Sequence, residues 1–181
     1  MTREQLEHAI RAAGAILGET ELYVLGSQAI LGAHPDAHPD LLRSMELDVA
    51  PKNKPELEAV IEGSIGELSP FHQTFGFYVD GMELSGVVLP RGWAGRVVVV
   101  DTPNTNGIRG LCLEAGDLAV SKLAAGRDKD LAYVRVLLRE RLVTAEVLQA
   151  RIDDVSGLDE SERGRLHERL ARLARDPAMT P

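Results

Sequence analysis

The hydrophobic pattern of this chain passes from a period of two to a helical period, and this change limits the class of fold. Four segments between residues 75 and 113 alternate apolar, often β-branched residues with polar ones: FGFYVD, MELSGVVLP, RVVVVD and IRGLCLE. Such alternation is typical of strands. Four later segments follow a helical spacing: DLAVSKLAA, KDLAYVRVLLRERL, TAEVLQARI and ESERGRLHERLARLAR. The sequence therefore predicts a sheet followed by a helical C-terminal third.

Helices and strands also alternate in the N-terminal part. Thr2 and Gln5 fit a capping box at the start of a helix, and Gly18 is placed to end it. The run ELYVL is short, apolar and bounded by glycine, which predicts a buried strand. Ser27 follows at a position suited to capping a short helix over SQAILGA.

The next strand is expected in MELDVAP. Its alternation places Met45, Leu47 and Val49 on one face and Glu46 and Asp48 on the other. A further helix is expected over PELEAVIEGSIGEL. Together these elements predict an α/β (α+β) protein with a central mixed sheet flanked by helices. We expect one domain over residues 1–181, with the α/β core at 1–113 and the helical part at 114–181.

Composition excludes several classes of protein. The chain has 181 residues, of which 44% are hydrophobic but only 4% aromatic, so aliphatic side chains must fill the core. Cys112 is the single cysteine, which excludes an internal disulfide or a cysteine-rich zinc site. No apolar run is long enough to span a membrane, and a cytoplasmic protein without membrane contact is expected. The net charge of −8 argues against a broad basic surface for nucleic acid.

The Gly26-Ser27 turn is the first candidate for ligand binding. A strand that ends in glycine and leads into a helix offers free backbone N–H groups to a phosphate. The glycine also lets a triphosphate approach the backbone, and the Ser27 hydroxyl is a further donor. The alternative is an ordinary helix cap, which serine often provides.

The acid pair is the second candidate. Glu46 and Asp48 lie two residues apart on one strand, so both carboxylates point to the same face. Crowded carboxylates repel each other, and Mg²⁺ is the natural counter-ion because it prefers oxygen ligands. The alternative is the solvent-facing side of an amphipathic strand, where an acid–x–acid pattern is common.

Taken together, LGSQAILG followed by RSMELDVAP resembles the nucleotidyltransferase superfamily, whose signature is a Gly-Ser turn followed by acid–hydrophobic–acid. The resemblance implies nucleotide binding by Gly26, Ser27 and Arg43 and metal binding by Glu46 and Asp48. Two features depart from the family pattern. Glutamate stands at position 46 where aspartate is usual, and the loop between the two motifs is long.

A downstream stretch, DLAVSKLAAGRDKDLAYVRVLL, resembles the abortive-infection type of nucleotidyltransferase toxins and their relatives. The resemblance implies that Lys122 neutralises the triphosphate and that Asp130 orients either the attacking hydroxyl or Lys122. Because Gly126 breaks the helix, both side chains could face one pocket. The alternative is an ordinary ion-pair cluster in a charged turn that also carries Arg127 and Lys129.

Many relatives have a third metal-binding carboxylate, for which Asp80 and Glu83 are the candidates. The resemblance implies Mg²⁺-dependent transfer of a nucleoside monophosphate from a nucleoside triphosphate to a hydroxyl acceptor. The acceptor is a tRNA 3′ end, a protein side chain or a small molecule, and a cognate antitoxin is a possible partner. The alternatives are a catalytically degenerate protein of the same fold that binds a nucleotide or a partner, and a domain with no ligand.

Overall fold

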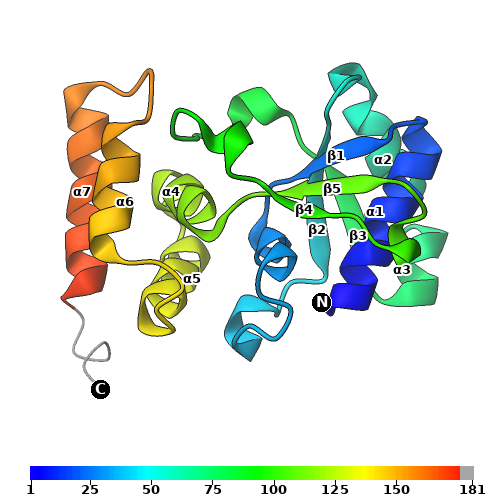
Figure 1. Cartoon of the computed structure of the whole chain (residues 1–181), viewed down its shortest axis with the longest axis horizontal. Helices are drawn as coiled ribbons and strands as arrows, with labels where there is room; N and C mark the ends of the chain where they lie inside the picture. The colour runs from blue at the N-terminus through cyan, green and yellow to red at the C-terminus, as the bar shows by residue number, and fades with distance from the viewer. Residues whose placement is uncertain (176–181) are drawn as a thin grey trace. The chain divides into compact units, whose positions relative to one another are not determined.

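Five strands form one mixed sheet in the order β3-β2-β1-β5-β4 (Figure 1). This computed structural model describes residues 1–175. The strands are β1 (Glu21–Val24), β2 (Glu46–Pro51), β3 (Tyr78–Gly81), β4 (Val98–Val100) and β5 (Arg109–Cys112). The pairs β1–β5 and β2–β3 are parallel, and β1–β2 and β4–β5 are antiparallel. The predicted α/β class with a mixed sheet is confirmed.

Strand β2 alternates as its sequence predicts. Leu47 and Val49 are fully buried, whereas Glu46 and Asp48 lie on the opposite, partly exposed face. Met45 is expected on the face of Leu47 and Val49, but it precedes the strand and is 54% exposed. Its backbone carbonyl instead accepts a hydrogen bond from Tyr78 at the start of β3. The buried face of β2 therefore begins at Leu47.

Three α-helices accompany the sheet: α1 (Arg3–Leu17), α2 (Glu58–Ile65) and α3 (Pro70–Phe75). The capping box of Thr2 and Gln5 is present at the start of α1, and Gly18 ends the helix with φ +60°, both as predicted. Ile10 of α1 packs directly on Gly110 of β5, where a side chain would find no room. Helices α1 and α2 pack against the strands (Figure 1) and cover the face that carries Leu47.

Two expected elements differ in the structure. The helix expected over residues 55–68 ends at Ile65, because Gly66 leaves the helical conformation and Leu68 has φ +63°. The strand expected in MELSGVVLP is wrong: only a 3₁₀ turn, Leu84–Gly86, forms there, and Pro90 makes a single bridge to Val155. Ser, Gly and Pro interrupt the apolar residues of this segment and disfavour a strand. The chain therefore leaves the sheet here.

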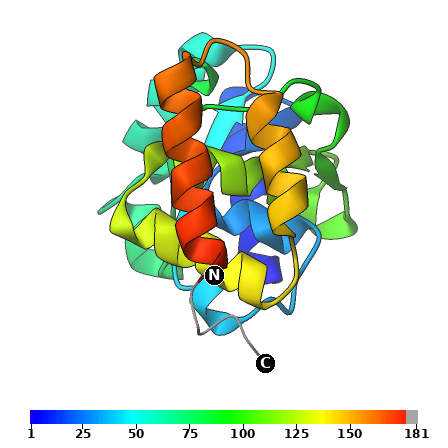
Figure 2. The same cartoon turned by 90° about the vertical axis from the view of Figure 1, so that its left-hand side faces the viewer.

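The remaining short elements are 3₁₀ helices: Ser27–Gly32, Pro39–Leu41, Pro55–Leu57, Trp93–Gly95 and Pro103–Thr105. The C-terminal part is helical as predicted, with α4 (Ala115–Ala125), α5 (Asp128–Arg139), α6 (Ala145–Asp153) and α7 (Glu160–Ala174). Figure 2 shows α6 and α7 side by side. The leucine stripe of α7 is buried: Leu166, Leu170 and Leu173. Within residues 1–175, no helix is both long and apolar enough to cross a membrane.

The chain divides into two compact units. The sheet unit contains residues 1–86 and 96–114, and the helical unit contains residues 87–95 and those from Ala115 onward. The segment 87–95 joins the helical unit because Arg91 bonds to Asp154 through both its backbone N–H and its guanidinium. The single domain expected from the sequence stays a prediction.

Candidate active site

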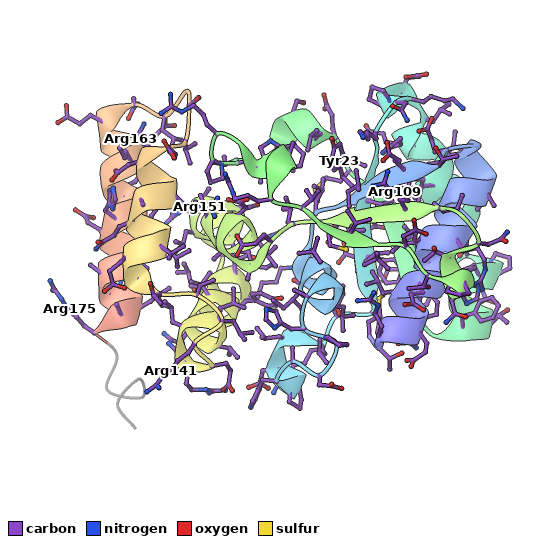
Figure 3. All side chains as sticks on the ribbon, in the orientation of Figure 1. Tyr23, Arg109, Arg141, Arg151, Arg163 and Arg175 are labelled. Atoms are coloured by element: carbon purple, nitrogen blue, oxygen red, sulfur yellow. The ribbon has the colours of Figure 1, made fainter. Side chains whose placement is uncertain are left out.

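Two neighbouring strands place three carboxylates on one face of the sheet. Asp48 of β2 and Asp80 of β3 are register partners, as are Glu46 and Tyr78. Partners in a parallel pair point to the same side, so Glu46, Asp48 and Asp80 share the face opposite α1 and α2. We call these three residues the acid face. Tyr23, labelled in Figure 3, lies on the same face of β1, because it is paired with Ala50, two residues beyond Asp48.

The acid face identifies which of the two candidate third carboxylates accompanies the pair. Asp80 is on β3 beside Asp48, whereas Glu83 lies beyond the strand and is exposed. The Glu83 carboxylate accepts a hydrogen bond from the Ser85 hydroxyl at 2.5 Å. Asp80 therefore belongs to the acid face and Glu83 does not.

Negative charge is concentrated here. Burial and a hydrogen bond with Glu46, together with the charges of Glu46, Glu62 and Glu67, raise the pKa of Asp80 to about 6. Burial and nearby carboxylates, Glu46 first among them, raise the pKa of Tyr78 to about 12. A hydrogen bond between two carboxyls requires a proton on one of them. The acid face thus favours either a shared proton or a cation.

Gly26 lies directly against Asp48. A Cβ atom built on Gly26 would lie 1.5 Å from Asp48 Oδ2, so only glycine leaves room for the carboxylate. The backbone of Gly26 is extended, and glycine is therefore required here for space and not for conformation. The Leu25 N–H donates to the Asp48 carbonyl at 3.0 Å, which fixes the end of β1 beside the acid pair. A phosphate that approaches the Gly26 backbone would also be next to Asp48.

The turn after Gly26 differs from the expected helix. Ser27 begins a six-residue 3₁₀ helix, Ser27–Gly32, and Gly26 rather than Ser27 occupies the position before it. Ser27 is therefore not the cap. A helix this short has only a weak dipole, so its dipole adds little to phosphate binding. Phosphate binding at this turn stays a prediction, and it would depend on the close approach of the Gly26 backbone.

Ser44 and Arg43 precede the acid pair. The Ser44 hydroxyl accepts from the Glu46 N–H at 3.1 Å and donates to the Glu46 carbonyl at 3.3 Å, which fixes the first residue of β2. The Arg43 side chain is 79% exposed and forms an ion pair with Asp40 at 2.5 Å. The structure thus places Arg43 at the surface just before the strand, and its nucleotide-binding role stays a prediction.

In the helical unit, the turn between α4 and α5 brings Lys122 and Asp130 together. Lys122 Nζ lies 3.2 Å from Asp130 Oδ1, and Asp130 is almost fully buried. Arg127 donates to the other carboxylate oxygen at 2.5 Å. The Lys122 ammonium also lies 4.6 Å from the centre of the Tyr133 ring, which suits a cation–π contact. Lys129 of the same turn is exposed.

The charge of Asp130 is stabilised by these partners. Burial raises the pKa of Asp130, but hydrogen bonds and charge from Arg127 and Lys122 outweigh it and bring the pKa below its usual value. Asp130 is therefore held as a carboxylate beside the Lys122 ammonium, and its role in orienting Lys122 or the attacking hydroxyl stays a prediction. The acid face and this ion pair belong to different units, so a shared pocket stays a prediction.

Most of the chain matches a known protein family. A family described as nucleotidyltransferases of unknown function, DUF6036, matches residues 4–171. The chain belongs to this family. No curated protein and no solved structure matches the chain.

The residues of the acid face and of the Lys122–Asp130 pair all lie within the matched stretch, 4–171. Sequence reasoning alone did not choose between Asp80 and Glu83, and it missed Tyr78. The usable signal was the alternation in FGFYVD, which places Tyr78 and Asp80 on one side of a strand. The partner strand, however, is known only from the structure.

Proposed function

We propose that the chain is a Mg²⁺-dependent nucleotidyltransferase that moves a nucleoside monophosphate from a nucleoside triphosphate to a hydroxyl acceptor. The observation that carries this proposal is the register of β2 and β3, which puts Asp48 beside Asp80 and Glu46 on the same face. Membership of a nucleotidyltransferase family supports it.

Carboxylates of the acid face have the donor chemistry that Mg²⁺ prefers. All three groups are carboxylates, and Mg²⁺ takes oxygen ligands and keeps positions for water and substrate phosphates. Within residues 1–175, no three acidic, histidine or cysteine side chains are arranged to ligate one ion. One or two protein carboxylates with substrate phosphates suffice for Mg²⁺, and Glu46 and Asp48 would supply them. When bound, Mg²⁺ would offset the negative charge that develops on the transferred phosphoryl group.

The chain's own residues have separate tasks in this proposal. Gly26 lets the triphosphate approach the backbone beside Asp48. The acceptor hydroxyl oxygen forms a bond to the α-phosphorus, and the bond from that phosphorus to the bridging oxygen breaks. Pyrophosphate leaves with the electron pair, and a carboxylate of the acid face takes the hydroxyl proton. Positioning and charge supply most of the rate in phosphoryl chemistry of this kind.

Lys122 would bind the β- and γ-phosphates of the triphosphate. Its ammonium is held by Asp130 and by the ring of Tyr133, so its direction is set before a ligand arrives. A pre-oriented cation loses less side-chain entropy on binding than a mobile one. Candidate acceptors are a tRNA 3′ end, a protein side chain and a small molecule, and an antitoxin is a candidate partner.

One observation favours a second function, that of a degenerate member that binds a nucleotide or a partner without catalysis. Glu46 is one methylene longer than the usual aspartate, and it hydrogen-bonds to Asp80. A proton shared by these two carboxyls would compete with a cation for the same oxygens.

Label transfer distinguishes the two functions. The protein is incubated with each of the four α-³²P-labelled nucleoside triphosphates and Mg²⁺, alone and with a total tRNA fraction. We expect labelled product and pyrophosphate with the wild type, and loss of both in Asp48→Asn and Asp80→Asn. Glu83→Gln is the matched control, because Glu83 is an acid just beyond β3 and should transfer normally. Equal transfer by Asp48→Asn would contradict the proposal, and Mg²⁺-dependent binding without transfer would favour the degenerate member.

A further inference from the structure

Arg169 of α7 reaches the C-terminal end of α4. Arg169 Nη1 donates to the carbonyls of Leu123, at 2.5 Å, and Ala124, at 3.1 Å. Carbonyls in the last turn of a helix have no partner within the helix, and a cation is favoured at this end. Figure 3 labels Arg163 and Arg175 near the two ends of α7, and Arg169 lies between them in the sequence.

The same guanidinium packs against the turn that follows α4. Gly126 has φ +65°, a conformation that favours glycine, and its N–H donates to the Lys122 carbonyl at 2.9 Å. A Cβ atom on Gly126 would lie 2.4 Å from Arg169 Cζ. The close fit therefore depends on glycine for both its conformation and its lack of a side chain.

This turn determines the geometry of the candidate catalytic pair. Lys122 immediately precedes Leu123, whose carbonyl Arg169 binds, and Asp130 lies in the first turn of α5 just after Gly126. Arg127, between them, bonds to Asp130. A change in the path of the chain at residues 123–126 would alter the approach of Lys122 to Asp130.

We propose that Arg169 is a positioning residue for the Lys122–Asp130 pair, which it holds through the α4–α5 turn. The catalytic importance of that pair rests on the proposed function. Water would satisfy the carbonyls of an ordinary exposed helix end without ordering a long side chain from another helix. Here Arg169 of α7 binds these carbonyls, and the first of them belongs to Leu123, the residue after Lys122.

Hydrogen exchange tests the positioning without any ligand. In Arg169→Ala, backbone amides of residues 122–131 should exchange faster, whereas those of α1 and β2 should not change. Arg172→Ala is the matched control, because Arg172 is an exposed arginine of the same helix, and its exchange should equal the wild type. Arg169→Lys keeps a donor for the carbonyls and should restore most of the protection. Unchanged exchange in Arg169→Ala would overturn the proposal.

A double-mutant cycle on triphosphate affinity tests whether Arg169 acts through Lys122. The probe is whichever of ATP, CTP, GTP and UTP the wild type binds most tightly with Mg²⁺. Arg169→Ala should weaken binding roughly threefold to tenfold in the wild type but have no effect in Lys122→Ala, because coupled residues are not additive. Equal losses in both backgrounds would overturn the proposal by showing general destabilisation or direct contact with the ligand. If no triphosphate binds the wild type, the proposed function fails, and hydrogen exchange alone decides the role of Arg169.

Discussion

Glu46 is the residue at which this chain departs most clearly from the pattern it resembles. Its carboxyl hydrogen-bonds to that of Asp80 on the neighbouring strand, which raises the pKa of Asp80. An aspartate at the same position would be one methylene shorter and would reach less far toward Asp80. The length of this side chain therefore affects how readily the acid face accepts a cation.

We predict that Glu46→Asp retains or raises transfer activity, because it shortens the side chain that bonds to Asp80. Glu46→Gln should lose activity, because an amide is a poorer metal ligand than a carboxylate. Label transfer at fixed Mg²⁺ measures both. Full activity in Glu46→Gln would show that Glu46 is a surface residue and would favour the degenerate alternative.

The next prediction concerns a substitution that adds a side chain, at Gly26, whereas Glu46→Asp shortens one. Gly26→Ala would place a Cβ atom 1.5 Å from Asp48 Oδ2, so the carboxylate must move. We expect loss of Mg²⁺-enhanced triphosphate affinity and a free energy of unfolding lower by about 1–3 kcal/mol, as for other overpacked sites. Calorimetry and urea unfolding measure the two effects.

Gly63→Ala is the control for this substitution. Gly63 is exposed within α2, and a Cβ atom there would contact nothing within 4 Å. Alanine is a better helix former, so the free energy of unfolding should rise by roughly 0.5–1 kcal/mol while binding is unchanged. Normal Mg²⁺ dependence in Gly26→Ala would contradict the assigned place of Asp48 at the metal site.

At the scale of elements, the sequence pattern predicted those features that depend only on residues close together in the sequence. The capping box of Thr2 and Gln5 and the terminating Gly18 need only neighbours in sequence, and α1 has both ends as predicted. The expected strand in MELSGVVLP failed because alternation alone does not supply a partner strand. That segment contacts the loop at Val155 instead, a contact between distant residues.

The candidate site shows the same difference between features set by neighbouring residues and features set by distant ones. The alternation in MELDVAP was enough to place Glu46 and Asp48 on one face of β2. Asp80 could only be a candidate, because its register against Asp48 depends on a pairing between strands about thirty residues apart, and such pairings follow from the whole sheet. Lys122 and Asp130 were within reach of prediction because a single turn joins them.

The α4–α5 turn gives a prediction that separates binding from turnover. Lys122→Ala should weaken triphosphate binding by roughly 1.5–3 kcal/mol, the usual contribution of a charge-assisted contact. Asp130→Asn should reduce turnover with a smaller effect on affinity, because it loosens Lys122 but leaves its charge. Asparagine is preferred to alanine here, since Asp130 is buried and neutralises two cations. Calorimetry measures the affinity of each variant, and label transfer measures its turnover. Equal losses of affinity and equal losses of turnover in the two variants would argue against separate roles.

At the scale of the whole molecule, charge is divided between the two units. Most of the lysines and arginines lie in the helical unit, and most of the acidic residues lie in the sheet unit. The net charge of −8 therefore arises mainly in the sheet unit, which carries the acid face, and not in the helical unit, which carries Lys122. A polyanionic acceptor would be repelled by the first unit and tolerated by the second.

The most direct test of the metal-dependent account is isothermal titration with each of the four nucleoside triphosphates, in Mg²⁺ and in EDTA. We predict that at least one triphosphate binds the wild type more tightly in Mg²⁺, because three same-face carboxylates repel a triphosphate unless a cation lies between them. Asp48→Asn should abolish this enhancement while the far-ultraviolet circular dichroism stays that of the wild type. Equal affinity in Mg²⁺ and in EDTA would contradict the assignment of the acid face as a metal-dependent nucleotide site.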